Sequence, residues 1–327
     1  ISLEKKLMNN YNQIQKVLHD IVLSKTFINK SLFEIEKIIY LKNEDIKNQS
    51  HIFISSLPRS GTTSLLNFIY SSNQYASLTY RNMPFVLSPH LSKFFNKKNF
   101  SKNERLHADG INYDINSPEA LDEIFFNNNE EFIENELLNY VQLVLLSENR
   151  LKYLSKNNLN FKRINLISSI LPNSIFLIPI REPLQQAYSL FSQHKHFNQL
   201  QKKDDFIRRY MNYLGHNEFG LNHIPWNNPI NFEDNNDINY WLEQWTLFYQ
   251  NILDKYLSSN NCFFIIYEKL INPDYIKSFL EKTCFKKTET LNLNYFKNSN
   301  KKEINIDYAK NIYEKAKDIY LNFNQKF

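Results

Sequence analysis

The sequence predicts an α/β fold in which a parallel sheet is flanked by helices. Three apolar runs, at residues 52–54, 174–181 and 262–270, have the character of buried strands, and each is followed by a turn and a helical pattern. Strands that alternate with helices build parallel sheets whose faces the helices cover. We expect one domain over residues 1–327, because 327 residues with 42% hydrophobic content suffice for a single large core.

The composition excludes several classes of protein. The net charge of +5, from 39 basic and 34 acidic residues, is too small and too dispersed to indicate nucleic-acid binding, but it suits a small polyanionic ligand. Cys262 and Cys284 are too few for a disulfide framework and indicate a reducing compartment. No apolar run is long enough to span a membrane. We therefore expect a soluble, cytoplasmic protein, although Ile1 in place of a starting Met leaves room for a missing N-terminal anchor.

Residues 1–48 predict two amphipathic helices ahead of the first strand. Apolar residues recur there at helical spacing, and lysines and glutamates lie between them. We interpret these helices as packing elements. The apolar positions are Ile14, Val17, Leu18, Ile21, Val22, Leu32, Ile35, Ile38 and Ile39.

Residues 52–66 predict a strand, a tight turn and the start of a helix. The free N–H groups and the positive dipole end of such a helix attract an anion. Gly61 lets the backbone approach the anion closely, and the hydroxyls of Thr62 and Thr63 can donate to phosphate oxygens. Arg59 adds a guanidinium able to hold an oxyanion with two hydrogen bonds. The segment therefore predicts a phosphate-binding loop.

The same loop argues against a nucleotide triphosphatase. Such a loop requires G-x-x-x-x-G-K-[ST], whereas Thr62 stands here where the Lys is needed. A nucleotide kinase or phosphotransferase is therefore the less favoured alternative. A non-catalytic nucleotide-binding module on the same scaffold is a third hypothesis.

A second motif follows the apolar run at residues 174–181. The run ends at Arg181, and Pro183 suits the first turn of a helix. Ser189 lies two turns further on, off the apolar stripe of this helix, and can face back towards Arg181. Pro179 inside the run predicts a frayed strand end, because proline removes a donor from the sheet ladder.

Together the two motifs resemble those of the sulfotransferases that use 3′-phosphoadenosine 5′-phosphosulfate (PAPS), in the carbohydrate and tyrosylprotein branch. The resemblance implies a P-loop-type sheet, PAPS as cofactor, no metal ion, and a hydroxyl acceptor, most simply that of a glycan. It implies 5′-phosphosulfate contacts from the loop, 3′-phosphate contacts from the second motif, and an approach of Lys156, at the end of a strand-like piece, to the phosphosulfate. The implied cofactor residues are Pro58, Arg59, Ser60, Gly61, Thr62, Thr63, Arg181 and Ser189.

The sequence departs from the tyrosylprotein enzymes at the second strand. The catalytic Glu of that branch has no counterpart in Ser77-Leu78-Thr79-Tyr80-Arg81, so a general base is needed from elsewhere. Residues 85–130 are long, irregular and polar, and we interpret them as a substrate-facing insertion, irregular with helical parts. Its candidate bases are His90, His107, Asp109, Glu119 and Glu123.

His107 is our first choice as base. Alternation places His107 and Asp109 on one side of an extended segment, and Gly110 permits a sharp turn after them. Asp109 is the second choice, as the partner that orients His107 or as the base itself. With Arg59 and Lys156, these two residues complete the predicted catalytic group. Neither the acceptor's identity nor the oligomeric state follows from the sequence.

Overall fold

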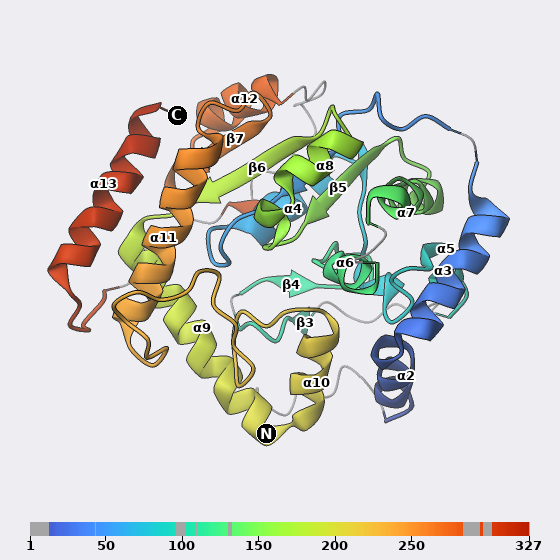
Figure 1. Cartoon of the computed structure of the whole chain (residues 1–327), viewed down its shortest axis with the longest axis horizontal. Coiled ribbons are helices and arrows are strands. Elements are labelled where there is room, and N and C mark those ends of the chain that lie inside the picture. Colours follow the sequence, from blue (N-terminus) through green and yellow to red (C-terminus); the bar gives the residue numbers. More distant parts are fainter. Residues whose placement is uncertain are drawn as a thin grey trace.

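A parallel sheet forms the centre of the molecule. The computed structural model describes residues 13–42, 44–95, 103–108, 110–129, 133–283, 295–296 and 303–326. Within these ranges the sheet has five strands in the order β2-β5-β1-β6-β7, every pair of them parallel (Figure 1). The predicted α/β fold class is confirmed. The strands are β1 (Ile52–Ile54), β2 (Tyr75–Ala76), β5 (Lys152–Lys156), β6 (Ile175–Ile180) and β7 (Cys262–Ile266).

Alternation along the strands divides the core between the two faces of the sheet. Ile52, Ile54 and Leu177 point to one face and pack with the residues of α4 (Thr62–Tyr70) and α12 (Pro273–Lys282). Phe53 and Phe176 point to the other face, where their rings stack 5.5 Å apart. That face is covered by α7 (Ile133–Glu148), α8 (Ile164–Ile170), α9 (Pro183–Lys203), α11 (Ile238–Tyr256) and α13 (Lys310–Lys326). Burial on both faces explains why these strands read as unbroken apolar runs.

The other elements lie beside the sheet and along one edge of it. In Figure 1, β3 and β4 run below the sheet, with α9 and α10 beneath them and α2, α3 and α5 on the right. β3 and β4 pair antiparallel, so the insertion contains a small sheet besides its helical and irregular parts. These elements are α2 (Gln13–Ser24), α3 (Thr26–Tyr40), α5 (Pro89–Phe95), β3 (Asn103–Glu104), β4 (Asn112–Tyr113), α6 (Glu123–Asn128) and α10 (Asp205–Tyr213), with 3-10 turns at Tyr80–Asn82, Asn160–Lys162 and Tyr267–Lys269.

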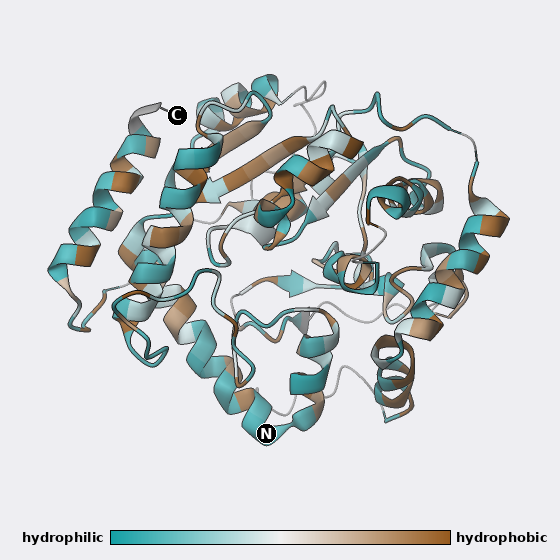
Figure 2. Ribbon diagram, in the orientation of Figure 1, coloured by the Kyte–Doolittle hydropathy of each residue, from teal (hydrophilic) through white to brown (hydrophobic). Residues whose placement is uncertain are grey.

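Hydropathy follows this arrangement. Figure 2 shows β6 almost wholly hydrophobic, whereas α9 and α13 alternate hydrophobic with hydrophilic residues. Across the described ranges, no helix has both the length and the apolar character needed to cross a bilayer.

Pro179 lies inside β6 rather than at a frayed end, which corrects our expectation. Its neighbour across the sheet is Ile265 of β7. On the other side, β1 has already ended at Ile54, so the missing N–H of Pro179 leaves no gap in that ladder. The Pro179 carbonyl instead accepts hydrogen bonds from Ser56 Oγ (2.6 Å) and Tyr249 Oη (3.1 Å). These bonds tie the loop after β1 to α11.

His51 joins the segment before β1 to β5 and is fully buried. Its Nδ1 accepts from the Tyr153 N–H (3.0 Å), so its Nε2 carries the proton and donates to the Ile46 carbonyl (2.9 Å). Burial, with a smaller contribution from the charge of Lys152, lowers the pKa of His51 to about 4, although the Ile46 contact opposes the shift.

We therefore expect acid to destabilise the fold through His51. The unfolded chain binds this proton near pH 6.5 and the folded protein only near pH 4, so stability is lost as pH falls through that window. Between pH 7 and pH 5 the loss should be about 2 kcal/mol. Urea unfolding of the wild type and His51→Gln at both pH values measures it. An equal pH dependence in the two proteins would contradict the assignment.

Candidate active site

The loop between β1 and α4 is held by one of its own side chains and by a side chain of α9. Ser60 Oγ donates to the Leu57 carbonyl (2.8 Å), and Gln186 Nε2 of α9 donates to the Pro58 carbonyl (2.9 Å). Arg59 adopts a φ of 68°, a left-handed conformation that is uncommon outside glycine. The neighbouring segments thus hold the loop in one shape.

Gly61 occupies the N-cap of α4, with a φ of 90° and no side chain to cap the helix. The first N–H groups of α4 therefore remain available to a ligand. A Cβ at this position would lie 2.3 Å from Cδ2 of Tyr267, so any other residue would clash with that ring as well as strain the backbone. Gly61 thus lets Tyr267 close against the loop.

The second motif meets the loop directly. α9 begins at Pro183, and the Glu182 carboxylate caps it by accepting from the Gln185 N–H (2.7 Å). Arg181, just before this cap, donates from Nη1 to the Arg59 carbonyl (3.2 Å). Ser189, two turns into α9, accepts from Arg59 Nε (3.0 Å). Residues more than a hundred positions apart in sequence therefore form one cluster.

A cleft of about 650 Å³ lies over this cluster. The start of α4 forms one wall, and the guanidinium of Arg181, 5.5 Å from the centre of the Tyr267 ring, lies beside it. The insertion supplies the facing wall, which includes Arg105, Gly110, Ile111, Asn112, Asp114, Asn116, Ser117 and Pro118. Guanidinium groups, hydroxyls and a helix N-terminus are the groups that bind phosphates in proteins.

A smaller pocket of about 30 Å³ continues the site inward. Arg59, Thr62 and Thr63 line both spaces. Lys156, at the carboxyl end of β5, lines only the inner pocket and is 8% exposed. The inner pocket is therefore small, basic and adjacent to the loop between β1 and α4.

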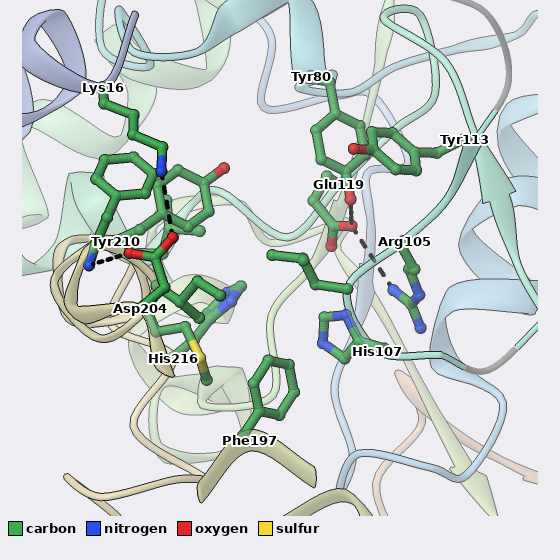
Figure 3. A pocket seen from close by; sticks show the side chains of 15 residues that line it. Lys16, Tyr80, Arg105, His107, Tyr113, Glu119, Phe197, Asp204, Tyr210 and His216 are labelled. Atoms are coloured by element: carbon green, nitrogen blue, oxygen red, sulfur yellow. Dashed lines mark hydrogen bonds and ion pairs between the residues drawn. The ribbon is translucent and has the colours of Figure 1, made fainter. Parts of the chain in front are cut away.

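Two carboxylates, Glu119 and Glu218, line the inner pocket, and Glu119 is the one that also borders Arg105. It accepts from Tyr80 Oη (2.5 Å), and its Oε2 lies 3.7 Å from Nη1 of Arg105 (Figure 3). Burial alone would raise the pKa of this carboxyl, but the charges of Arg105 and Lys156, with hydrogen bonds from Tyr80 and the Ala120 N–H, lower it to about 2. Glu119 is therefore ionised at neutral pH.

The structure separates the other candidate bases. His107 lines the inner pocket together with Glu119. His90 lies elsewhere, with its Nδ1 3.1 Å from the Glu36 carboxylate and its ring stacked on Tyr40. Glu123 pairs with Arg163 through two bonds, of 2.8 and 2.6 Å. Asp109 lies outside the described residues.

Arg105 and Tyr267 did not stand out in the sequence as site residues. Arg105 is 6% exposed and lines both the cleft and the inner pocket. Tyr267 belongs to a Tyr-Glu-x-Leu segment after β7 that we would assign to the fold. The next residue, Glu268, accepts from the Glu182 N–H (2.9 Å) and so holds the turn that carries Arg181. Neither contact has a local sequence signal, because each joins segments distant in the chain.

Comparison with known proteins gives the family. The model of the Sulfotransferase family matches residues 51–274, more than half of the chain, including the loop at 58–63, Arg181 and Ser189. The chain belongs to the sulfotransferase family. Membership of this family, which the two motifs indicated, is therefore confirmed.

A solved sulfotransferase structure shares the fold. Sulfotransferase STF1 from Mycobacterium tuberculosis H37Rv superposes with a TM-score of 0.51 at 10% identity, over 95% of this chain and 86% of that chain. Sulfotransferase STF9 from Mycobacterium avium gives a TM-score of 0.48 at 10% identity, over 98% of this chain and 88% of that chain. Curated proteins gave no match.

Proposed function

We propose that this sulfotransferase transfers a sulfuryl group from PAPS to a hydroxyl group. The observation that supports this most directly is the meeting of two phosphate-binding segments at one cleft. Arg59 donates to Ser189, and Arg181 donates to the Arg59 carbonyl. PAPS carries phosphate at both the 5′ and the 3′ position of one ribose, so its binding requires two such segments side by side.

The arrangement of these residues fits PAPS as the ligand. The loop at Pro58–Thr63 and the start of α4 would hold the 5′-phosphosulfate, with Gly61 leaving its backbone bare. Arg181 and Ser189 would hold the 3′-phosphate. Arg181, Tyr267 and the loop line one continuous cleft, so both groups can belong to one ligand.

The chain's own groups would act by positioning and by stabilising charge. PAPS supplies an activated sulfuryl group. As the acceptor oxygen bonds to sulfur, the bond from sulfur to the 5′-phosphate oxygen breaks, and by analogy with phosphoryl transfer the transition state is loose. Arg59, Lys156 and the N-terminus of α4 would stabilise the negative charge that develops on the leaving oxygen. The acceptor proton passes to a base.

His107 fits the role of base better than Glu119. A base works best when its pKa is near the working pH, and a carboxylate with a pKa of about 2 binds a proton too weakly. Imidazole ordinarily titrates at roughly pH 6.5. In this arrangement Glu119 holds Arg105 and Tyr80 in place, and its negative charge balances the positive charge of Lys156.

The pH dependence of turnover separates these two groups. With His107 as base, kcat at saturating PAPS should fall as the pH is lowered, because protonated imidazole accepts no proton. His107→Gln should lower kcat at least about tenfold and remove this acid limb. Glu119→Gln should still lose turnover at low pH. If turnover instead stays constant down to pH 5 and only Glu119→Gln abolishes it, the base is Glu119.

Ligand binding distinguishes the proposal from its alternatives. We expect adenosine 3′,5′-bisphosphate to raise the thermal midpoint and ATP with Mg²⁺ to raise it less, since only the former presents a 3′-phosphate to Arg181 and Ser189. A response to ATP with Mg²⁺ alone would favour a phosphotransferase. Binding without sulfate transfer to any acceptor would favour the non-catalytic module.

A further inference from the structure

A third space adjoins the inner pocket on the side away from the cleft. This cavity of about 90 Å³ is lined by residues of α2, the 3-10 turn at Tyr80–Asn82, the insertion, α9, α10 and the segments that flank α10. Arg105, His107, Glu119 and His216 line both this cavity and the inner pocket. The cavity therefore lies where an acceptor would approach a sulfuryl group held beside Arg59 and Lys156.

The walls of this cavity are mostly apolar or aromatic. Tyr80 and Tyr113 pack with ring centroids 4.3 Å apart, and Phe206 and Tyr210 with centroids 5.8 Å apart. Phe197 meets the ring of His107 edge-on at 5.1 Å. Aliphatic side chains complete the lining: Leu106, Ile207, Met211 and Leu214.

Charged groups lie at two ends of the cavity and already have partners. At one end Lys16 Nζ lies 3.2 Å from the Asp204 carboxylate, and at the other Glu119 is bound by Tyr80 and Arg105 (Figure 3). Figure 3 shows Phe197 and His107 facing the space between these ends. Only the Glu119 end borders the inner pocket, so the acceptor hydroxyl belongs there and the rest of the acceptor meets apolar walls.

We propose that the acceptor is an apolar alcohol or phenol, a single hydroxyl on a small hydrocarbon group that fills this cavity. A sugar carries a hydroxyl on nearly every ring carbon, and burying these against apolar walls leaves them without hydrogen bonds. A hydrocarbon group gains from the same burial, and an aromatic ring gains further from edge-to-face contacts. The proposal thus favours a hydrophobic acceptor class over the glycan expected from the sequence. The proposed function enters only in naming the group transferred.

Cyclohexanol and myo-inositol form a matched pair for the test, because they share a six-carbon ring and differ in the number of hydroxyls. Saturation-transfer NMR without nucleotide should detect binding of cyclohexanol and of phenol, but not of myo-inositol. Labelled sulfate from PAPS should then appear on cyclohexanol or phenol. Binding or sulfation of myo-inositol in preference to cyclohexanol would overturn the proposal.

Two variants and a control locate the binding. Met211→Trp should fill the cavity and weaken cyclohexanol binding at least tenfold. Ile207→Ala should enlarge it and shift the preference towards 4-tert-butylphenol. Ile224→Trp, at a position 58% exposed that does not line the cavity, should change neither. Cyclohexanol binding that is unaltered in both cavity variants would place it elsewhere.

Binding of adenosine 3′,5′-bisphosphate, followed in the same proteins, separates this proposal from the proposed function. It should be unchanged in Met211→Trp, since Met211 does not line the cleft. If the wild type binds cyclohexanol but does not bind adenosine 3′,5′-bisphosphate, the proposed function is refuted and the apolar site is supported. Nucleotide binding without cyclohexanol or phenol binding would refute the acceptor class alone.

Discussion

Replacing Arg59 with alanine is expected to lower turnover about 100- to 1,000-fold, the loss usual when one donor to a developing oxyanion is removed. Arg59 lines both the cleft and the inner pocket, so its guanidinium lies where the bond to the leaving oxygen would break. The charge it meets arises mainly during transfer. Single-turnover rates at saturating PAPS should therefore fall more than PAPS affinity does.

Three further variants isolate the role of this guanidinium. Arg59→Gly removes the side chain and relieves the left-handed backbone at φ 68°, so a loss equal to that of Arg59→Ala would exclude backbone strain as the cause. Arg59→Lys should restore part of the rate, because it keeps the charge without the planar fork. Arg59→Ala also removes the hydrogen bond from Arg59 Nε to Ser189, and Ser189→Ala measures how much that bond alone contributes to the rate. Equal losses in affinity and efficiency, with single-turnover chemistry unchanged, would assign Arg59 to ground-state binding.

Replacing Arg181 with alanine is expected to abolish most of the preference for PAPS over adenosine 5′-phosphosulfate. A hydrogen bond to a charged group contributes about 1.5–3 kcal/mol, which corresponds to roughly 10- to 150-fold in affinity. The lower part of that range suits Arg181, whose side chain is only half-buried. Ser189→Ala should cost less, about 1 kcal/mol for one ordinary hydrogen bond. Equilibrium binding of the two nucleotides to each variant measures the preference.

Arg181 also supports the loop, and the same comparison detects this second role. Its bond to the Arg59 carbonyl is made without ligand, so part of the loss can come from a loosened loop. A loosened loop would weaken both nucleotides equally, whereas a lost 3′-phosphate contact affects PAPS alone. Undiminished discrimination in Arg181→Ala would refute the 3′-phosphate assignment. Arg181→Gln, which keeps an uncharged donor on a shorter side chain, should fall between wild type and alanine.

Much of the fold, and the local shape of the two segments that form the cleft, could be predicted from sequence because both depend on neighbouring residues. An apolar strand, a turn with Gly61 and a helix that starts at Thr62 form one continuous segment. The same holds for β6, Arg181 and the helix begun by Pro183. Pro179 was misplaced because the strand that would have needed its N–H ends two residues short of it, which only the strand register shows.

The sequence by itself determined the parallel sheet, the loop before α4 and the position of Arg181 just ahead of the helix that carries Ser189, since strand alternation and helical spacing are local properties of the chain. Tertiary structure alone decided what surrounds them. Tyr267 reaches Gly61 from a strand end some two hundred residues away. Glu119 gains its low pKa from Arg105 and Lys156, and the apolar cavity closes only when α2 and α10 pack together. Such contacts depend on how distant segments pack, and no local pattern records that.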